Sequence, residues 1–140
     1  MKSILVVGHG LAGAILAHTL IDRGINVTCV EGELKHTASR IAAGLINPFI
    51  GPKLNTPKDY NSSINANNEF FGRIRKQYNK QFLHSIDLVR IFQNPGQKER
   101  WHSLSPQYRK QELSSYDCKK HELLAQYGGG ITRAYKLDST

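Results

Sequence analysis

The chain has 140 residues, a length that fits one ordinary domain. Hydrophobic residues make up 39% and charged residues 21%, which indicates a globular protein and excludes a low-complexity or disordered chain. The 19 Lys and Arg residues outnumber the 11 Asp and Glu residues, and the formal net charge of +8 favours anionic partners such as nucleotides, nucleic acid or acidic metabolites.

Several classes of protein are excluded by what the sequence lacks. The longest apolar run near the N-terminus, residues 4–7, is too short for a transmembrane helix or for the core of a secretory signal peptide. Cys29 and Cys118 form no CxxC pair, so they indicate neither a disulfide framework nor a zinc site. The histidines show no HxxxH or HExxH spacing. We therefore expect a cytoplasmic protein without a membrane segment or a bound metal.

The first part of the chain predicts a strand, a helix and a second strand. Residues 3–7 form a continuous apolar run that ends at a glycine, which is typical of a buried parallel strand. Over residues 11–23 apolar side chains recur at helical spacing, and Gly24 stands where a helix C-cap glycine belongs. Residues 26–31 are rich in β-branched side chains and predict the second strand. Such βαβ units are almost always right-handed.

The next segment has a different character. Residues 32–59 carry several glycines and prolines without a sustained period, so they predict an ordered loop. One short helix is expected there, from Thr37 to about Gly44, with Thr37 or Ser39 as its cap. Residues 61–80 are polar with apolar side chains at near-helical spacing, which predicts a long amphipathic helix.

The remainder of the chain predicts two strands with helices between them. Residues 82–92 alternate partly between apolar and polar side chains and predict a strand. Residues 97–126 predict two or three polar helices, broken near Pro106. Residues 131–137 predict the last strand. The apolar anchors expected for the polar helices are Trp101, Leu104, Leu113, Leu123 and Leu124.

Residues 8–13 have the sequence GHGLAG and form a GxGxxG motif, which follows one predicted strand and opens a predicted helix. Gly8 permits a tight turn, Gly10 lets the backbone approach a pyrophosphate, and Gly13 lets the helix pack against the strand. The helix N-terminus then presents unpaired N–H groups and a positive dipole end to phosphate oxygens. The alternative is that the glycines only punctuate a strand, a turn and a helix.

An acidic residue completes the motif. Glu31 ends the second predicted strand and lies 18 positions after Gly13, where its carboxylate can accept hydrogen bonds from the two ribose hydroxyls of adenosine. A carboxylate at this position would repel a 2′-phosphate. The motif therefore predicts a dinucleotide other than NADP.

The glycine spacing and the residues that follow resemble known flavoproteins. The pattern from Val7 to Glu31 is similar to the extended FAD-binding signature of glutathione-reductase-type flavoproteins. Residues 38–48, ASRIAAGLINP, resemble the second motif of the D-amino-acid oxidase family, which includes glycine oxidase and sarcosine oxidase.

The resemblance implies roles for the second motif. Ser39 and Arg40 would lie near the pyrophosphate or the ribose, and residues 42–45 would be backbone neighbours of the isoalloxazine ring. The alternative for residues 42–44 is a plain helix end. The residues expected to bind FAD are Gly8, Gly10, Leu11, Ala12, Gly13, Glu31, Gly32, Ser39, Arg40, Ala42, Ala43, Gly44 and Leu45.

The fold that this resemblance implies is α/β, with a Rossmann-like FAD-binding βαβ start followed by an incomplete α+β segment of a substrate domain. Residues 1–57 would form the N-terminal part of the FAD-binding domain, and residues 58–140 would form part of the substrate domain. Members of the family run to several hundred residues, so the chain resembles the N-terminal portion of a larger flavoprotein. We expect an incomplete sheet to favour self-association, and we expect no oxidase activity from these residues alone.

The function that the resemblance implies is flavin-dependent oxidation of an amine or amino acid, by hydride transfer to flavin N5. Two alternatives remain open. The GxGxxG motif and Glu31 also allow an NAD-dependent dehydrogenase domain, and the charge of +8 allows a nucleotide-binding or tRNA-contacting module without catalysis. Trp101 and Tyr108 could stack on bases in such a module, although we favour a role in the core.

Overall fold

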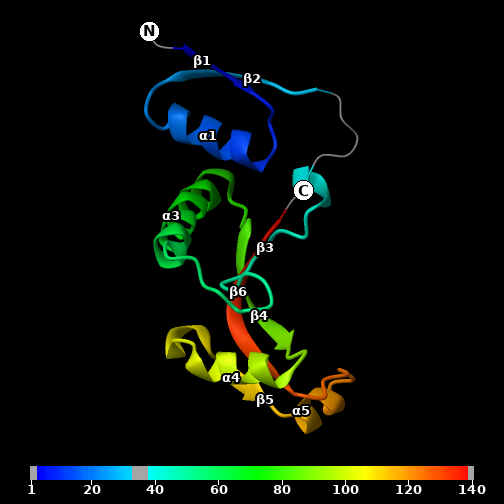
Figure 1. The fold of residues 1–140 in the computed structure, drawn as a ribbon. Helices are drawn as coiled ribbons and strands as arrows, with labels where there is room; N and C mark the ends of the chain where they lie inside the picture. The colour runs from blue at the N-terminus through cyan, green and yellow to red at the C-terminus, as the bar shows by residue number, and fades with distance from the viewer. Residues whose placement is uncertain (1–2, 33–37, 139–140) are drawn as a thin grey trace. The chain divides into compact units, whose positions relative to one another are not determined.

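A computed structural model describes residues 3–32 and 38–138 of the chain (Figure 1). These residues divide into two compact units, of which the second is formed by residues 45–137. Both units contain helices and strands, which confirms the predicted α/β class with a Rossmann-like start. The expected boundary after residue 57 lies inside the second unit, and the assignment of residues 1–57 to the FAD-binding domain remains a prediction.

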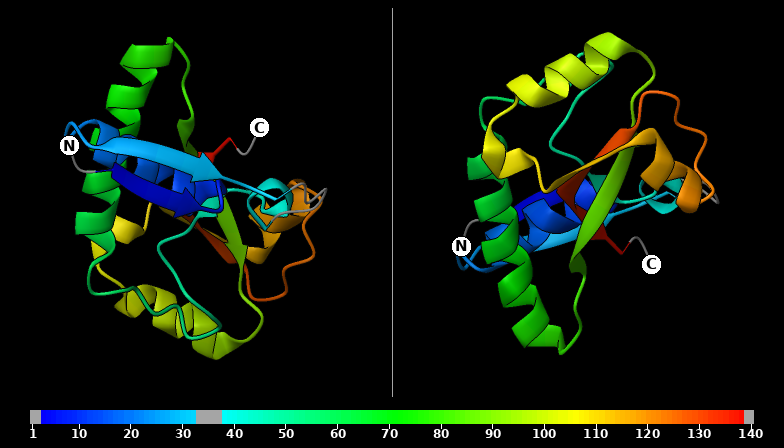
Figure 2. Two further views of the ribbon diagram at one scale, coloured as in Figure 1. Left: turned by 90° about the horizontal axis from the view of Figure 1, so that it is seen from above. Right: turned by 90° about the horizontal axis from the view of Figure 1, so that it is seen from below.

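The first unit contains the predicted strand, helix and strand, but the first strand, which was predicted to be buried, is exposed in the described structure at every residue except Val6. Its elements are β1 (Ser3–Val7), α1 (Leu11–Ile21), β2 (Asn26–Val30) and the short helix α2 (Ala38–Ile41). Figure 2 shows β1 and β2 side by side and pointing in the same direction. The two strands are parallel and in register from the pair Ser3 and Asn26 to the pair Val7 and Val30.

The end of α1 explains why the chain can turn back so quickly into β2. Gly24 has φ of +72°, the left-handed conformation that favours glycine. The N–H of Ile25 donates to the carbonyl of Leu20 at 3.1 Å, which closes the last turn. The predicted C-cap role of Gly24 is confirmed. Of the two expected capping residues of α2, Thr37 lies outside the described residues, and Ser39 lies inside the helix and so does not precede it as a cap.

The second unit is built around its last strand. Its elements are β3 (Leu45–Ile46), α3 (Tyr60–Tyr78), β4 (Leu83–Ile91), α4 (Pro95–Ser103), the 3₁₀ helix η1 (Pro106–Tyr108), β5 (Gln111–Leu113), α5 (Ser115–Lys120) and β6 (Gly129–Leu137). The sheet has the order β3-β6-β4, β5 also pairs with β6, and every pairing is antiparallel. The predictions of α3, β4 and β6 are confirmed.

Three predictions for the second unit are wrong. Residues 45–46 were expected in a loop but form β3, and residues 111–113 were expected among polar helices but form β5. Both strands are short, and both exist because β6 supplies a long hydrogen-bonding edge on which a few residues suffice. Leu124 was expected to anchor a helix, whereas its side chain is fully exposed.

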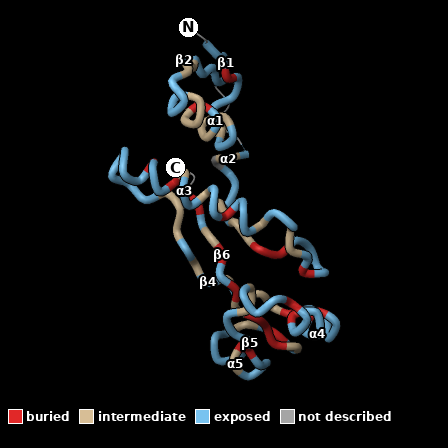
Figure 3. Tube along the Cα trace, turned by 90° about the vertical axis from the view of Figure 1, so that its left-hand side faces the viewer, coloured by how far each residue is buried: buried red, intermediate tan, exposed pale blue. Residues whose placement is uncertain are grey.

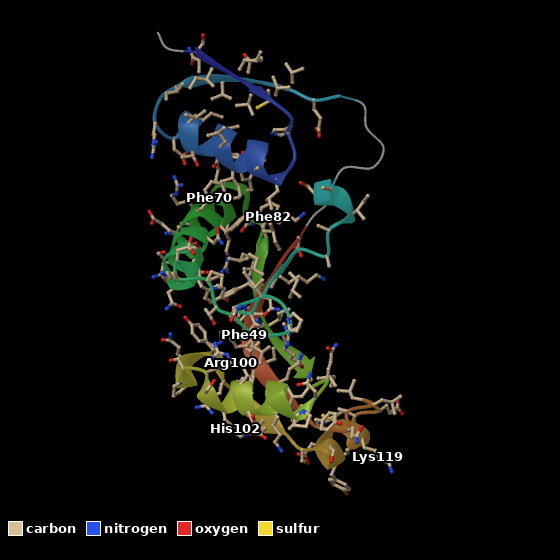
Figure 4. All side chains as sticks on the ribbon, in the orientation of Figure 1. Phe49, Phe70, Phe82, Arg100, His102 and Lys119 are labelled. Atoms are coloured by element: carbon tan, nitrogen blue, oxygen red, sulfur yellow. The ribbon has the colours of Figure 1, made fainter. Side chains whose placement is uncertain are left out.

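The main core of the second unit lies around Trp101. Figure 3 shows much of the buried chain in this unit, around β6 and α4. Trp101 is 1% exposed, and its ring packs edge-to-face on Phe49 with the ring centroids 5.9 Å apart (Figure 4 labels Phe49). The core role favoured for Trp101 is confirmed. The buried members of this cluster are Phe49, Leu54, Phe92, Trp101 and Leu104.

The described residues also bear on membranes and metals. None of their helices has the length together with the hydrophobicity that crossing a bilayer would need. Within residues 3–32 and 38–138, no group of three or more His, Cys, Asp or Glu side chains is arranged to hold a metal ion. Cys29 and Cys118 are both free thiols.

Candidate dinucleotide-binding site

The glycine motif begins where the parallel ladder of the first unit ends. The N–H of Gly8 donates to the carbonyl of Val30 at 2.7 Å, so Gly8 is the last residue that β2 holds in place. Gly8 has φ of +92°, a conformation in which a Cβ would be strained. The chain can therefore leave β1 in a tight turn only because this residue is glycine, as the sequence predicts.

Gly13 is required by close packing. A Cβ on Gly13 would lie 1.9 Å from the carbonyl oxygen of Gly8 and 3.5 Å from a methyl carbon of Val6. The first turn of α1 thus rests directly on the turn that precedes it, and then on β1. The expected helix–strand contact is present, but the carbonyl of Gly8 is the nearer constraint.

The first turn of α1 presents backbone donors. The first N–H bonded inside the helix is that of Ala14, which donates to the carbonyl of Gly10 at 2.9 Å. The N–H of Leu11 donates instead to the hydroxyl of Ser39 at 2.9 Å. The N–H groups of Ala12 and Gly13 have no acceptor among the described residues, as is expected for a helix N-terminus. Two donors at the positive end of the helix dipole can thus bind an anion.

The acidic residue of the motif lies at the same edge of the strand pair. Val7 and Val30 are opposite each other at the ends of β1 and β2, so Gly8 and Glu31 both follow directly after that edge. Glu31 is exposed, which leaves its carboxylate able to accept hydrogen bonds from a ligand. Gly32 is also exposed, and apart from its chain neighbours no atom of the described residues lies within 4 Å of the place where its Cβ would be.

The second motif reaches the glycine loop through Ser39. Ser39 lies in α2, and its contact with Leu11 joins residues 28 positions apart in the sequence. This contact brings the two predicted parts of the site together within the first unit. The side chain of Arg40 lies outside the described part of the structure, so its contact with a pyrophosphate remains a prediction.

The residues after α2 were expected beside the isoalloxazine ring. The N–H of Ala42 donates to the carbonyl of Ala38 at 2.9 Å and closes the final turn of α2, and Ala43 is exposed. Gly44 has φ of +67°, so it turns the chain in a way that other residues rarely allow. Leu45 begins β3, opposite Lys136 of β6. Contact of these residues with a flavin ring remains a prediction.

The architecture fits a dinucleotide. The turn at Gly8, the close approach at Gly13, the open donors of Ala12 and Gly13, and the exposed carboxylate of Glu31 are the features that a pyrophosphate and a ribose require. The contact that sequence reasoning missed is the one between Ser39 and Leu11. No signal in the sequence could have found it, because neither residue is in a periodic pattern that relates the two.

Comparison with known proteins agrees with this geometry. The family model described as FAD dependent oxidoreductase, DAO, matches residues 3–135, which include both units. Searches of curated proteins and of solved structures gave no significant match. The cofactor of the family is FAD, which favours the flavin over the nicotinamide alternative. The chain therefore belongs to the family of FAD-dependent oxidoreductases.

Proposed function

We propose that this chain supplies the adenosine and pyrophosphate part of the FAD site in an oxidoreductase that oxidises an amine or an amino acid. The observation that supports this proposal most directly is the first turn of α1. There the N–H groups of Ala12 and Gly13 have no acceptor in the described part of the chain, and they lie next to a tight turn at Gly8. The proposal of an amine or amino acid substrate rests on the resemblance of residues 38–48 to the D-amino-acid oxidase family.

Different residues of the chain would bind different parts of the cofactor. The two open N–H groups and the dipole of α1 would bind pyrophosphate oxygens, and Arg40 would add positive charge beside them. The carboxylate of Glu31 would accept hydrogen bonds from the ribose hydroxyls, which orients the adenosine. The backbone of residues 42–45 would lie beside the isoalloxazine ring.

The chemistry of the reaction depends on the bound cofactor. When bound, FAD supplies at N5 the acceptor for the hydride that leaves the carbon next to the substrate amine. The residues of this chain would bind and orient the cofactor, and none of them is assigned a catalytic role. Self-association of the chain also remains a proposal. It is supported by exposed apolar side chains in the strand pair, since Leu5 is 61% and Val7 is 80% exposed.

The direct test is a calorimetric titration of the full chain with ADP. We expect Glu31→Gln to weaken ADP binding about tenfold, because a neutral amide is a poorer acceptor for ribose hydroxyls than a carboxylate. Glu99→Gln is the matched control, since Glu99 is an exposed residue of α4 in the second unit. Equal affinity of Glu31→Gln and the unmodified chain would remove Glu31 from the site.

A further inference from the structure

We propose that Ser39 is a positioning residue that caps α1 from a distant part of the sequence, and that its hydroxyl is a further reason for glycine at position 10. Ser39 would act through the glycine loop, by fixing the backbone from which the phosphate donors extend. The inference rests on the proposed function in one respect, since an effect of Ser39 on nucleotide binding requires that this loop holds the pyrophosphate of FAD.

The first observation is the capping geometry. A helix N-terminus is usually capped by the side chain of its own N-cap residue, often Ser, Thr, Asp or Asn. Gly10 is the N-cap of α1 and has no side chain to do this. The hydroxyl of Ser39 accepts the hydrogen bond of the Leu11 N–H at 2.9 Å and so provides the missing cap.

The second observation is the space at Gly10. Its φ of −70° and ψ of −172° are available to any residue, so backbone conformation does not require glycine here. A Cβ on Gly10 would lie 2.9 Å from Oγ of Ser39 and 3.7 Å from Cβ of Ser39, and apart from the chain neighbours of Gly10 no other described residue is within 4 Å. Removal of the hydroxyl alone would leave an ordinary contact distance. Among the described residues, a Cβ at position 10 is therefore excluded only as long as the Ser39 hydroxyl stays on the N–H of Leu11.

The two observations indicate what the hydrogen bond between Ser39 and Leu11 does for the glycine loop. The hydrogen bond fixes α2 to the glycine loop and occupies the N–H of Leu11, which leaves the N–H groups of Ala12 and Gly13 as the donors for phosphate. A loop held in its binding geometry loses less conformational freedom when a ligand binds. Loss of the hydroxyl should therefore weaken nucleotide binding through the loop.

A double-mutant cycle of Gly10→Ala and Ser39→Ala tests this inference, with amide hydrogen exchange at Leu11 measured by NMR without nucleotide. We expect Ser39→Ala to raise the exchange rate of the Leu11 N–H about fivefold, the ratio that corresponds to loss of a typical N-cap. Gly10→Ala should have a similar effect by displacing the hydroxyl. In the Ser39→Ala background, Gly10→Ala should change the rate by less than about twofold, because the steric conflict is gone.

Two further variants complete the design. Ser39→Thr retains a hydroxyl and should retain both slow exchange at Leu11 and ADP affinity, whereas Ser39→Ala should weaken ADP binding about tenfold. Ser63→Ala, an exposed position in α3, is the matched control and should change neither measurement. Trp101 fluorescence verifies that the second unit of each variant is folded.

The outcomes separate the inference from the proposed function. Unchanged exchange at Leu11 in Ser39→Ala, or an equally large effect of Gly10→Ala in both backgrounds, would overturn the role of Ser39. If exchange responds as expected but the unmodified chain binds no ADP, the capping contact stands and the proposed nucleotide site fails. If ADP binding depends on Glu31 but not on Ser39, the nucleotide site stands and the positioning role fails.

Discussion

The two glycine-rich segments of the chain, residues 8–13 in the first unit and residues 128–130 in the second, need glycine for different reasons. In the first segment a Cβ on Gly13 would meet a backbone carbonyl at 1.9 Å, beside backbone donors that no described residue uses. In the second segment a Cβ on Gly130 would lie 2.5 Å from the ring of Trp101, which is part of the core.

The backbone hydrogen bonds show what this difference means. Gly129 and Gly130 belong to β6 and lie opposite residues of both β4 and β5, so their backbone is paired inside a sheet. The N–H groups of Ala12 and Gly13 have no such partner among the described residues. A glycine-rich segment with open donors can cradle a ligand, whereas one with paired donors lets a large side chain approach the strand.

The largest expected effect on nucleotide binding is that of Gly13→Ala. The added Cβ must move the first turn of α1 away from Gly8, and overpacking of about 1–3 kcal/mol corresponds to a loss of ADP affinity of about 5- to 150-fold. Calorimetry measures this loss. Trp101 fluorescence should show the second unit unchanged. An ADP affinity within about twofold of that of the unmodified chain would contradict the claim that close packing at Gly13 shapes the nucleotide site.

Gly130→Ala should produce the opposite pattern. Because the added Cβ enters the space of the Trp101 ring, we expect the free energy of unfolding to fall by about 1–3 kcal/mol. Urea denaturation followed by fluorescence of Trp101, the single tryptophan of the chain, measures this change. ADP affinity should remain the same. An unchanged unfolding midpoint would show that the core beside β6 accommodates the added methyl group without loss of stability.

Gly72→Ala is the control for replacing a glycine where the added Cβ meets no neighbouring element. Gly72 is an exposed residue within α3, and apart from its chain neighbours and the backbone of α3 no described atom lies within 4 Å of the place where its Cβ would be. Since alanine is the better helix former, the variant should gain up to about 1 kcal/mol of stability. Urea denaturation measures the gain. A loss of stability here would mean that the effects at Gly13 and Gly130 are not specific to their neighbours.

The smallest expected effect concerns acid stability of the second unit. Hydrogen bonds from the side chain and then the backbone N–H of Ser114 lower the pKa of Asp117 from its ordinary value of 3.8. Because the folded-state pKa is the lower one, this stabilisation is complete above the ordinary value and is lost as pH falls through the folded-state pKa. Asp117→Asn should remove this part of the pH dependence.

Urea denaturation of the unmodified chain and of Asp117→Asn, at pH values from above 3.8 downward, measures the effect of Asp117 on stability. ADP affinity at neutral pH should not change, because Asp117 belongs to the second unit. A pH dependence that is the same in both chains would show that this capping contact is absent in solution.

Local patterns made the first unit predictable, while the second unit depends on distant partners. β1, α1 and β2 follow from an apolar run, a helical period and the glycines that end each element. β3 could not be predicted, because two residues have no period and their partner, β6, lies far along the chain. β5 has only three residues, two of them polar, and its pairing with β6 overrides local preference.

The same limit applies to the candidate site. The turn at Gly8 and the close packing at Gly13 could be predicted, because a strand, a turn and a helix adjacent in sequence demand them. The hydrogen bond between Ser39 and Leu11 could not, since it depends on where α2 returns after a loop. Leu124 failed as a predicted anchor for a related reason, because helical spacing alone does not show which side chains find a core.

The most direct test of the account is an NMR titration of the uniformly ¹⁵N-labelled full chain with ADP. We predict that the largest changes in amide chemical shift occur at Ala12 and Gly13, that changes also occur next to Glu31, and that the amide signals of Gly129 and Gly130 do not shift. Shifts concentrated at residues 128–130, or an absence of shifts at Ala12 and Gly13 under saturation, would contradict the claim that the first glycine segment is the nucleotide site.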